Sequence, residues 1–195
     1  MKCFVFPLTH ANLFPLTTKP LNIFEPRYLQ MIKEAIDTNT PVALAYLPDN
    51  GDTYRSIAGY GHPQIIDQRD NNTLLVFLSG VSKVRIISEH KDVTKPFIVA
   101  ECEPIHEDLN LDENLKPKFM KLSHLLVQWV QRHIPDAEQR EVFVRSLKGP
   151  QEIIGAFAAY LIRDYDLQYE MMELTSLNEQ INYLYRLFES NELST

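Results

Sequence analysis

Ser88 and Lys91 form the S-x-x-K pattern of some serine hydrolases, in which the lysine activates the serine. That chemistry needs the serine at the start of a helix and the lysine one turn later, so that both side chains point into one pocket. Here the pair lies at the end of a predicted strand, in a polar loop. We therefore interpret the segment as a solvated loop, with a cryptic hydrolase as an alternative.

Other residue types that bind metals or cofactors lack the spacing that such chemistry requires. The six histidines are scattered, without the i, i+4 spacing that puts two ligands on one helix face. Gly59-Tyr60-Gly61 lacks the third glycine of a dinucleotide loop, and predicts a distorted strand instead. Cys3 and Cys102 are distant in sequence and form no C-x-x-C motif. We expect no metal, cofactor or disulfide, and a reducing cytoplasm.

The composition is that of a globular protein with an acidic surface. Of 195 residues, 45% are hydrophobic and 23% charged, and the formal net charge is −7. Nucleic acids and anionic membranes are disfavoured as partners, because their binding relies on Lys and Arg. The first residues do not form a secretory signal, and no apolar run is long enough to span a membrane.

The first half of the chain has the pattern of short strands separated by turns, since apolar runs rich in Val, Ile, Phe and Tyr alternate with Pro, Asn, Asp and Gly. We predict strands near residues 3–8, 42–47, 56–67, 73–79, 82–88 and 97–104. One helix begins at Pro26 and stops before Asn39 and Pro41. A single helix among many strands favours a small, closed or half-closed β-barrel over a doubly wound α/β sheet.

Beyond the acidic stretch 101–113 the apolar period changes from two to about 3.6 residues, which predicts helices. We place a boundary near residue 110, between a β-barrel subdomain (1–110) and a bundle of about four helices (111–195). Asp136 is expected to cap one helix, Pro150 to open the next, and Ser176 to Glu179 to form a capping box. The inward positions are expected at Phe119, Leu122, Leu126, Trp129, Val130, Phe143, Leu147, Ile153, Ile154, Phe157, Tyr160, Leu161, Ile181, Leu184 and Phe188.

A long motif near the N-terminus resembles the N-terminal domain family of Lon proteases. The family pattern has F-P, then P-L-x-I-F-E-x-R-Y and a following Met, and it matches Phe14-Pro15, the segment Pro20 to Tyr28, and Met31. Gly61 and the segment Gly80 to Ile86 resemble the glycine-led strands of the family, and Leu16 stands where Gly is common. The resemblance implies an α+β fold, with a PUA-like β-barrel that carries one inserted helix and is followed by a helical bundle.

The resemblance also suggests which motif residues are structural. We interpret the following as holding the fold: Pro20, Phe24, Glu25, Arg27, Tyr28, Met31, Gly61 and Gly80. Phe24 and Tyr28 would be core anchors, Glu25 would lie at the positive end of the helix dipole, and Arg27 would bind a carboxylate or backbone carbonyls. The loop Phe14, Pro15 and Leu16 is the candidate polypeptide-binding surface. Phe14 could equally plug the barrel.

In Lon this domain helps to recognise unfolded or tagged polypeptides. The chain has neither the phosphate-binding G-x-x-x-x-G-K-[ST] loop nor a G-x-S-x-G nucleophile turn. We therefore expect a stand-alone, non-catalytic module that binds unfolded or partly folded polypeptides, as an adaptor in protein quality control beside a separate protease or chaperone. A small-molecule or RNA binder is the alternative, since PUA-like barrels also bind RNA. The oligomeric state and the client stay open.

Overall fold

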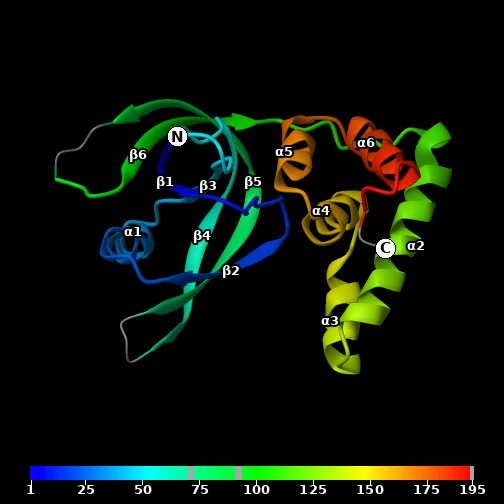
Figure 1. Ribbon diagram of the computed structural model, residues 1–195, viewed down its shortest axis with the longest axis horizontal. Helices are drawn as coiled ribbons and strands as arrows, with labels where there is room; N and C mark the ends of the chain where they lie inside the picture. The colour runs from blue at the N-terminus through cyan, green and yellow to red at the C-terminus, as the bar shows by residue number, and fades with distance from the viewer. Residues whose placement is uncertain (70–72, 91–93, 194–195) are drawn as a thin grey trace. The chain divides into compact units, whose positions relative to one another are not determined.

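The computed structural model describes residues 1–69, 73–90 and 94–193. The chain divides into two compact units, Met1–Ile105 and His106–Thr195. The strands and one helix belong to the first unit, and the second unit is helical (Figure 1).

The first unit is built on a ring of paired strands. Its strands are β1 (Lys2–Leu8), β2 (Thr18–Ile23), β3 (Val42–Tyr46), β4 (Ile57–Gln68), β5 (Leu74–His90) and β6 (Ile98–Ile105). The sheet order is β2-β5-β4-β3-β1-β6, and a further β5–β6 pairing closes five strands into a ring. Only β1 and β3 run parallel among the described pairs; the others are antiparallel.

Strand β5 is the longest element of the ring, and it corrects the sequence prediction. Residues 73–79 and 82–88 were expected as two strands, but β5 is continuous over 17 residues. Its first half pairs with β2 and its second half with β6. Strand β2 was not predicted, because Lys19, Pro20 and Asn22 interrupt its apolar pattern.

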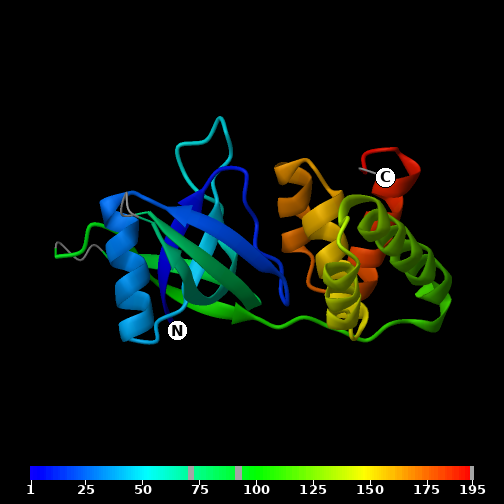
Figure 2. The ribbon, with the colours of Figure 1, turned by 90° about the horizontal axis from the view of Figure 1, so that it is seen from below.

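Helix α1 (Pro26–Asp37) runs beside the strands of its own unit (Figure 2). Pro26 occupies its first turn, as predicted, and the helix ends at Thr38, after which Asn39 takes a φ of 52°. Its buried side chains are Tyr28, Leu29, Met31, Ile32 and Ala35. These residues join Phe4 and Phe6 of β1 in the larger apolar cluster.

The second cluster contains small side chains and both cysteines. Because successive residues of a strand point to opposite faces, β1 directs Phe4 to the first cluster and both Cys3 and Val5 to the second. Pairing of β1 with β6 brings Cys3 and Cys102 into this second cluster, and both thiols are free and buried. A hydrogen bond with Cys102 and burial raise the pKa of the Cys3 thiol, which keeps it protonated.

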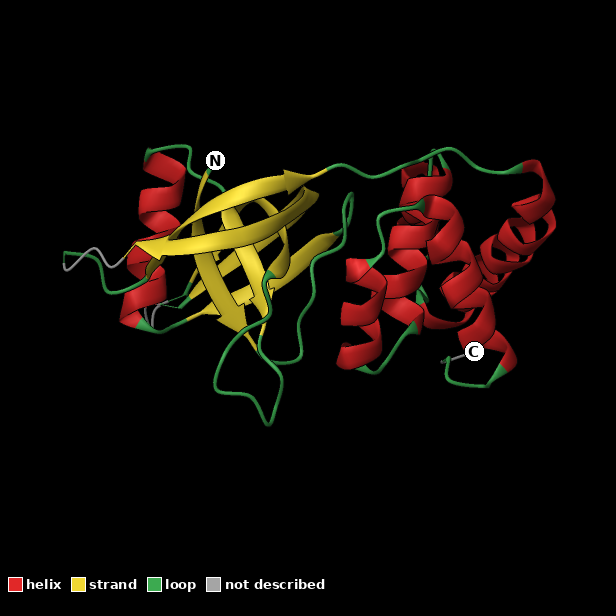
Figure 3. Ribbon diagram, turned by 90° about the horizontal axis from the view of Figure 1, so that it is seen from above, coloured by secondary structure: helices red, strands yellow, loops and turns green. Residues whose placement is uncertain are grey.

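As far as residue 193, the second unit contains a 3₁₀ turn and five α-helices rather than about four. Figure 3 shows that helices and loops build this unit. They are η1 (Glu113–Leu115), α2 (Lys116–His133), α3 (Ala137–Ser146), α4 (Pro150–Leu161), α5 (Tyr165–Glu173) and α6 (Leu177–Glu189). Helix α5 was missed because it has only nine residues, too few for a clear apolar period. It buries Tyr169, Met171 and Met172.

All three predicted helix starts in this unit are confirmed, but the capping box predicted for the last of them is wrong. The Asp136 side chain accepts from the Gln139 N–H and caps α3, and Pro150 occupies the first turn of α4. Ser176 precedes α6, but its side chain makes no capping hydrogen bond, so the capping box does not form. Tyr160 was expected inside, yet it is 38% exposed, and its ring stacks on that of Trp129 with the centroids 5.5 Å apart.

Within the described residues, no helix is long and apolar enough to cross a membrane. No group of three or more His, Cys, Asp and Glu side chains in those residues is placed to hold a metal ion.

Candidate functional site

The segment before β2 lies directly on glycines of β4 and β5. A Cβ atom on Gly59 would stand 1.7 Å from the Leu13 carbonyl oxygen, and one on Gly80 would stand 2.3 Å from the Phe14 oxygen. Both distances are far inside van der Waals contact, so only glycine allows the backbones to approach this closely. The glycines therefore determine where the Phe14-Pro15-Leu16 loop lies.

Backbone hydrogen bonds then hold this loop in one conformation. The Leu16 N–H donates to the Gly80 carbonyl, and the Gly80 N–H donates to the Thr17 carbonyl, both at 2.8 Å. The Thr17 hydroxyl donates to the Phe14 carbonyl at 2.7 Å. These three hydrogen bonds hold the backbone of the loop against Gly80.

The three candidate binding residues separate into two kinds. Phe14 is 3% exposed and Pro15 is buried, so neither side chain is accessible to a ligand. Leu16 is 52% exposed and has a φ of 60°. Val81, which follows Gly80, is 51% exposed. Leu16 is therefore the part of the loop that a ligand can reach. Val81 of β5 follows Gly80, the residue to which the Leu16 N–H donates.

Leu16 occupies a backbone conformation that leucine rarely adopts. A left-handed φ costs an L-residue about 1–2 kcal/mol because its Cβ crowds the following carbonyl. Glycine adopts a φ of 60° freely, because it has no Cβ. The chain instead keeps a large apolar side chain there, exposed and held in strain.

Several motif residues lie in structural positions. Tyr28 is buried, with its ring centroid 4.3 Å from that of Phe6, and Met31 is fully buried. The Arg27 Nε donates to the Glu25 carboxylate at 2.9 Å, which confirms the expected carboxylate partner. The Arg27 guanidinium also lies 4.4 Å from the centre of the Tyr28 ring.

Phe24 contradicts the prediction that it anchors the core, because it is 68% exposed. The cause is strand alternation: Leu21 and Ile23 of β2 point inward, so the next residue points to solvent. Pro20 is also exposed, on β2 opposite Phe77.

Gly61 is required by a close approach between β4 and β5. A Cβ atom there would stand 1.9 Å from the Ser79 carbonyl oxygen. The β4–β5 register shifts between Tyr60 and Gly61, which confirms the predicted strand distortion.

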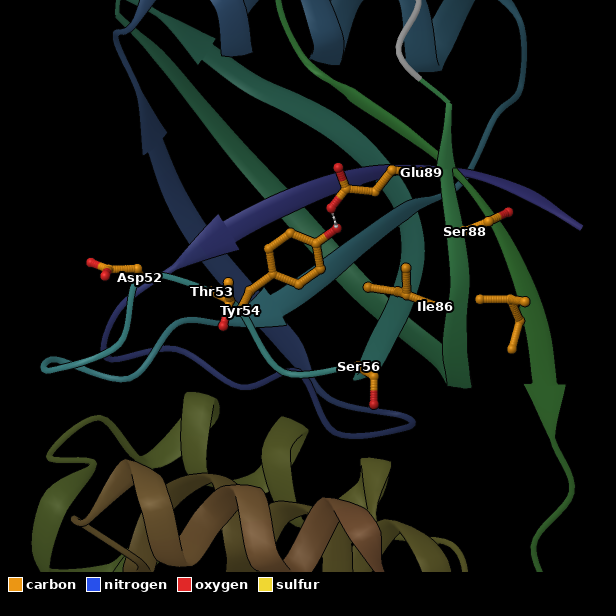
Figure 4. A pocket seen from close by; sticks show the side chains of 8 residues that line it. Asp52, Thr53, Tyr54, Ser56, Ile86, Ser88 and Glu89 are labelled. Carbon is orange, nitrogen blue, oxygen red and sulfur yellow. Dashed lines mark hydrogen bonds between the residues drawn. The ribbon is translucent and has the colours of Figure 1, made fainter.

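A pocket of about 340 Å³ lies where β5 runs past the start of β4. Its lining is Asp52, Thr53, Tyr54, Ser56, Ile86, Ile87, Ser88 and Glu89. The Tyr54 hydroxyl donates to the Glu89 carboxylate at 2.5 Å, so the ring spans from the loop to β5 (Figure 4). A register shift between Ile86 and Ser88 leaves Ile87 as the bulged residue, 58% exposed.

The environment of Tyr54 keeps its phenol as a hydrogen-bond donor. Burial, and then the hydrogen bond to the Glu89 carboxylate, raise the pKa of Tyr54 well above its ordinary value. At neutral pH the hydroxyl therefore remains protonated, and the ring is fixed as one wall of the pocket.

Ser88 lies in this pocket but not in the arrangement that a catalytic dyad needs. It belongs to β5 rather than to a loop, which corrects the prediction, and its side chain points away from the Tyr54 ring (Figure 4). Lys91 lies outside the described residues. The described lining contains no lysine or histidine to act as a base.

The sequence reasoning did not find the pocket. Tyr54 and Glu89 are 35 positions apart, and only the path of β5 beside residues 52–56 brings them together. No local pattern marked the bulge, because consecutive apolar residues occur both at Ile86 and Ile87 and in the regularly paired start of β5, Leu74 to Leu78.

The family follows from comparison with known proteins. The model of the ATP-dependent protease La (LON) substrate-binding domain matches residues 2–190. The chain belongs to this family, which is a substrate-binding and not a catalytic domain. It is therefore a substrate-recognition module. No curated protein sequence is similar enough to count as a match.

Solved structures show the same fold. The N-terminal domain of the Lon protease of Mycobacterium avium complex is similar with a TM-score of 0.72 and 14% identity, over 97% of this chain and 98% of that one. The crystal structure of a Lon N-terminal domain protein from Xanthomonas campestris is similar with a TM-score of 0.67 and 18% identity, over 95% of this chain and 98% of that one.

Proposed function

We propose that this chain binds unfolded or partly folded polypeptides through the surface at Leu16, without cleaving them, and acts as an adaptor for a separate protease or chaperone. The observation that carries this proposal is the exposed, strained Leu16 on a loop held by backbone hydrogen bonds to Gly80. A strained residue persists only where the surrounding structure holds it, and such residues gather at binding sites.

The geometry suits binding of apolar side chains. Leu16 and Val81 are each about half exposed, and the hydrogen bonds to Gly80 fix the loop before a ligand arrives. A preformed apolar contact loses little conformational entropy on binding. Unfolded polypeptides expose the apolar side chains that folded proteins bury, so they are the partners that this surface would select.

The other parts of the proposal rest on the sequence and on the cysteines. These 195 residues contain no phosphate-binding loop, and we propose that a separate protease or chaperone supplies the energy for unfolding a bound client. The two cysteines form no C-x-x-C motif, and we propose a reducing cytoplasm as the compartment.

The test is a binding assay with a permanently unfolded protein, reduced and carboxymethylated α-lactalbumin carrying a fluorescent label. Leu16→Ala should weaken binding about tenfold, because burial of the lost methylenes contributes roughly 1.4 kcal/mol. Ile66→Ser is the matched control, since Ile66 is an exposed apolar residue of β4 on the same unit. A labelled RNA should not bind the chain at physiological salt, in keeping with the net charge of −7.

Two results would contradict the proposal. One is a folded wild-type chain that binds no unfolded protein. The other is an equal loss of binding in Leu16→Ala and Ile66→Ser. Cleavage of casein by the purified chain, lost in Ser88→Ala, would support a hydrolase instead.

A further inference from the structure

Strand β5 has an open edge beside the Tyr54 pocket. β4 begins at Ile57, opposite Arg85, and the last backbone hydrogen bond on that side runs from the Ile86 N–H to the Ser56 carbonyl at 2.8 Å. Beyond it β5 continues to His90 and pairs only with β6 among the described strands. One side of residues 87–90 therefore carries no neighbouring strand within the described structure.

An open strand edge can accept an extended polypeptide, because the added chain pairs its backbone with the strand and places alternate side chains in adjoining pockets. Here the pocket adjoins that edge. Ile86 and Ile87 supply apolar surface, and the bulge exposes Ile87 to the solvent. The edge and the pocket together have the parts of a strand-addition site.

The charged residues of the pocket indicate which kind of polypeptide segment would bind there. The charged side chains in its lining are Asp52 and Glu89, both acidic. Glu89 accepts a hydrogen bond from the neutral Tyr54 hydroxyl at 2.5 Å, which fixes the position of its carboxylate. A carboxylate held in this way, in a pocket whose lining also contains Ile86 and Ile87, favours a Lys or Arg side chain.

We propose that the open edge of β5 at residues 87–90 binds an extended segment of a client polypeptide in which a Lys or Arg alternates with apolar residues. An apolar side chain of the bound segment lies on Ile86 and Ile87. The Lys or Arg of that segment pairs with Glu89, which Tyr54 holds in place. The inference rests on the proposed polypeptide-binding function and adds a second contact surface to the one at Leu16.

The experiment measures fluorescence anisotropy of a short labelled peptide of alternating valine and lysine with the whole chain. Glu89→Gln keeps an acceptor for Tyr54 and removes the charge, and should weaken binding about fivefold. A valine–serine peptide should show no such difference. Asp67→Asn is the matched control, since it removes one negative charge on β4, in a part of the strand that does not line the pocket.

Two further arms test the backbone pairing and the apolar contact. A valine–lysine peptide N-methylated at alternate residues lacks the donors for strand pairing and should bind about tenfold more weakly. Ile87→Ser should weaken both the lysine and the serine peptide. Circular dichroism of each variant, unchanged from wild type, verifies that it is folded.

The outcomes separate this inference from the proposed function. If unfolded α-lactalbumin binds and depends on Leu16, but Glu89→Gln and N-methylation have no effect, the strand-addition site is wrong and the function stands. If no unfolded protein binds, the function itself fails. Concentration-dependent dimerisation that Ile87→Ser abolishes would assign the edge to a second copy of the chain and overturn the inference.

Discussion

The carbonyl oxygen of Leu13 lies where a β-carbon of Gly59 would be, only 1.7 Å from that position. This contact joins the loop before β2 to β4, 46 positions later in the chain, and it leaves no room for any side chain at residue 59. The exposed Leu16 follows three residues after Leu13, so the same contact determines where the candidate binding residue lies.

Gly59→Ala is expected to destabilise the first unit by about 3 kcal/mol, because the loop or β4 must move to admit the methyl group. Hydrogen exchange of β4 and β5 peptides measures the change. Gly51→Ala is the control: its Cβ would meet Pro48 at 3.4 Å, an ordinary contact, and we expect a change within about 0.5 kcal/mol. Equal effects of the two substitutions would contradict the close approach at Gly59.

Leu16→Gly is expected to be more stable than Leu16→Ala by about 0.5–1 kcal/mol, the reverse of the order at a residue with negative φ. The reason is the φ of 60°, which glycine adopts freely and alanine does not. Urea unfolding of the two variants measures the difference. An alanine variant as stable as the glycine variant would show that the loop is not strained.

Lys95 and Glu34 form a partly buried ion pair between the segment before β6 and α1. The Lys95 ammonium also lies 5.1 Å from the centre of the Phe4 ring. Lys95→Met should lower the free energy of unfolding of the first unit by roughly 1–2 kcal/mol, since it leaves the Glu34 carboxylate without its cation. A double-mutant cycle with Glu34→Gln should give a coupling energy of about 1 kcal/mol, and a value near zero would exclude the pair as a stabilising contact.

Asp136→Ala should destabilise α3 by about 1 kcal/mol, because the Asp136 carboxylate accepts from the Gln139 N–H at 2.8 Å. Ser176→Ala, at the start of α6, should change stability by less than about 0.5 kcal/mol, since that serine makes no capping bond. Amide exchange in the first turn of each helix measures both effects. A larger effect at Ser176 than at Asp136 would contradict the assigned caps.

Tyr183 makes the second unit sensitive to alkaline pH. Its hydroxyl donates to the Leu167 carbonyl and to the Glu170 carboxylate, and burial followed by the bond to Glu170 raises its pKa above 10.0. A raised pKa in the folded state gives stability that is present below pH 10 and is lost as the pH rises through the folded value. Tyr183→Phe should therefore be less stable than wild type at neutral pH by about 1 kcal/mol, with a smaller difference above about pH 10.

Urea unfolding followed by the fluorescence of Trp129, the single tryptophan, measures this pH dependence in the second unit. A Tyr183→Phe variant whose stability falls in parallel with that of wild type through the alkaline range would assign the loss to other groups.

Local patterns in the sequence determined much of this protein. Strand alternation and helical period placed β1, β3, β4, β6, α1, α2, α4 and α6, because those patterns depend on neighbouring residues alone. The order of residues from Phe14 to Met31 indicated the family, which the match over residues 2–190 confirms. Pro26 and Asp136 marked helix starts because a helix start depends on a few adjacent residues.

Only the tertiary structure decided which residues are exposed and which meet. Phe14 and Phe24 are both apolar motif residues, yet one is buried and the other exposed, because the path of the chain over Gly80 and the alternation of β2 set their directions. Tyr54 meets Glu89 only because β5 extends past the first residue of β4. Burial and long-range contact depend on where distant segments pack, and no local pattern contains that information.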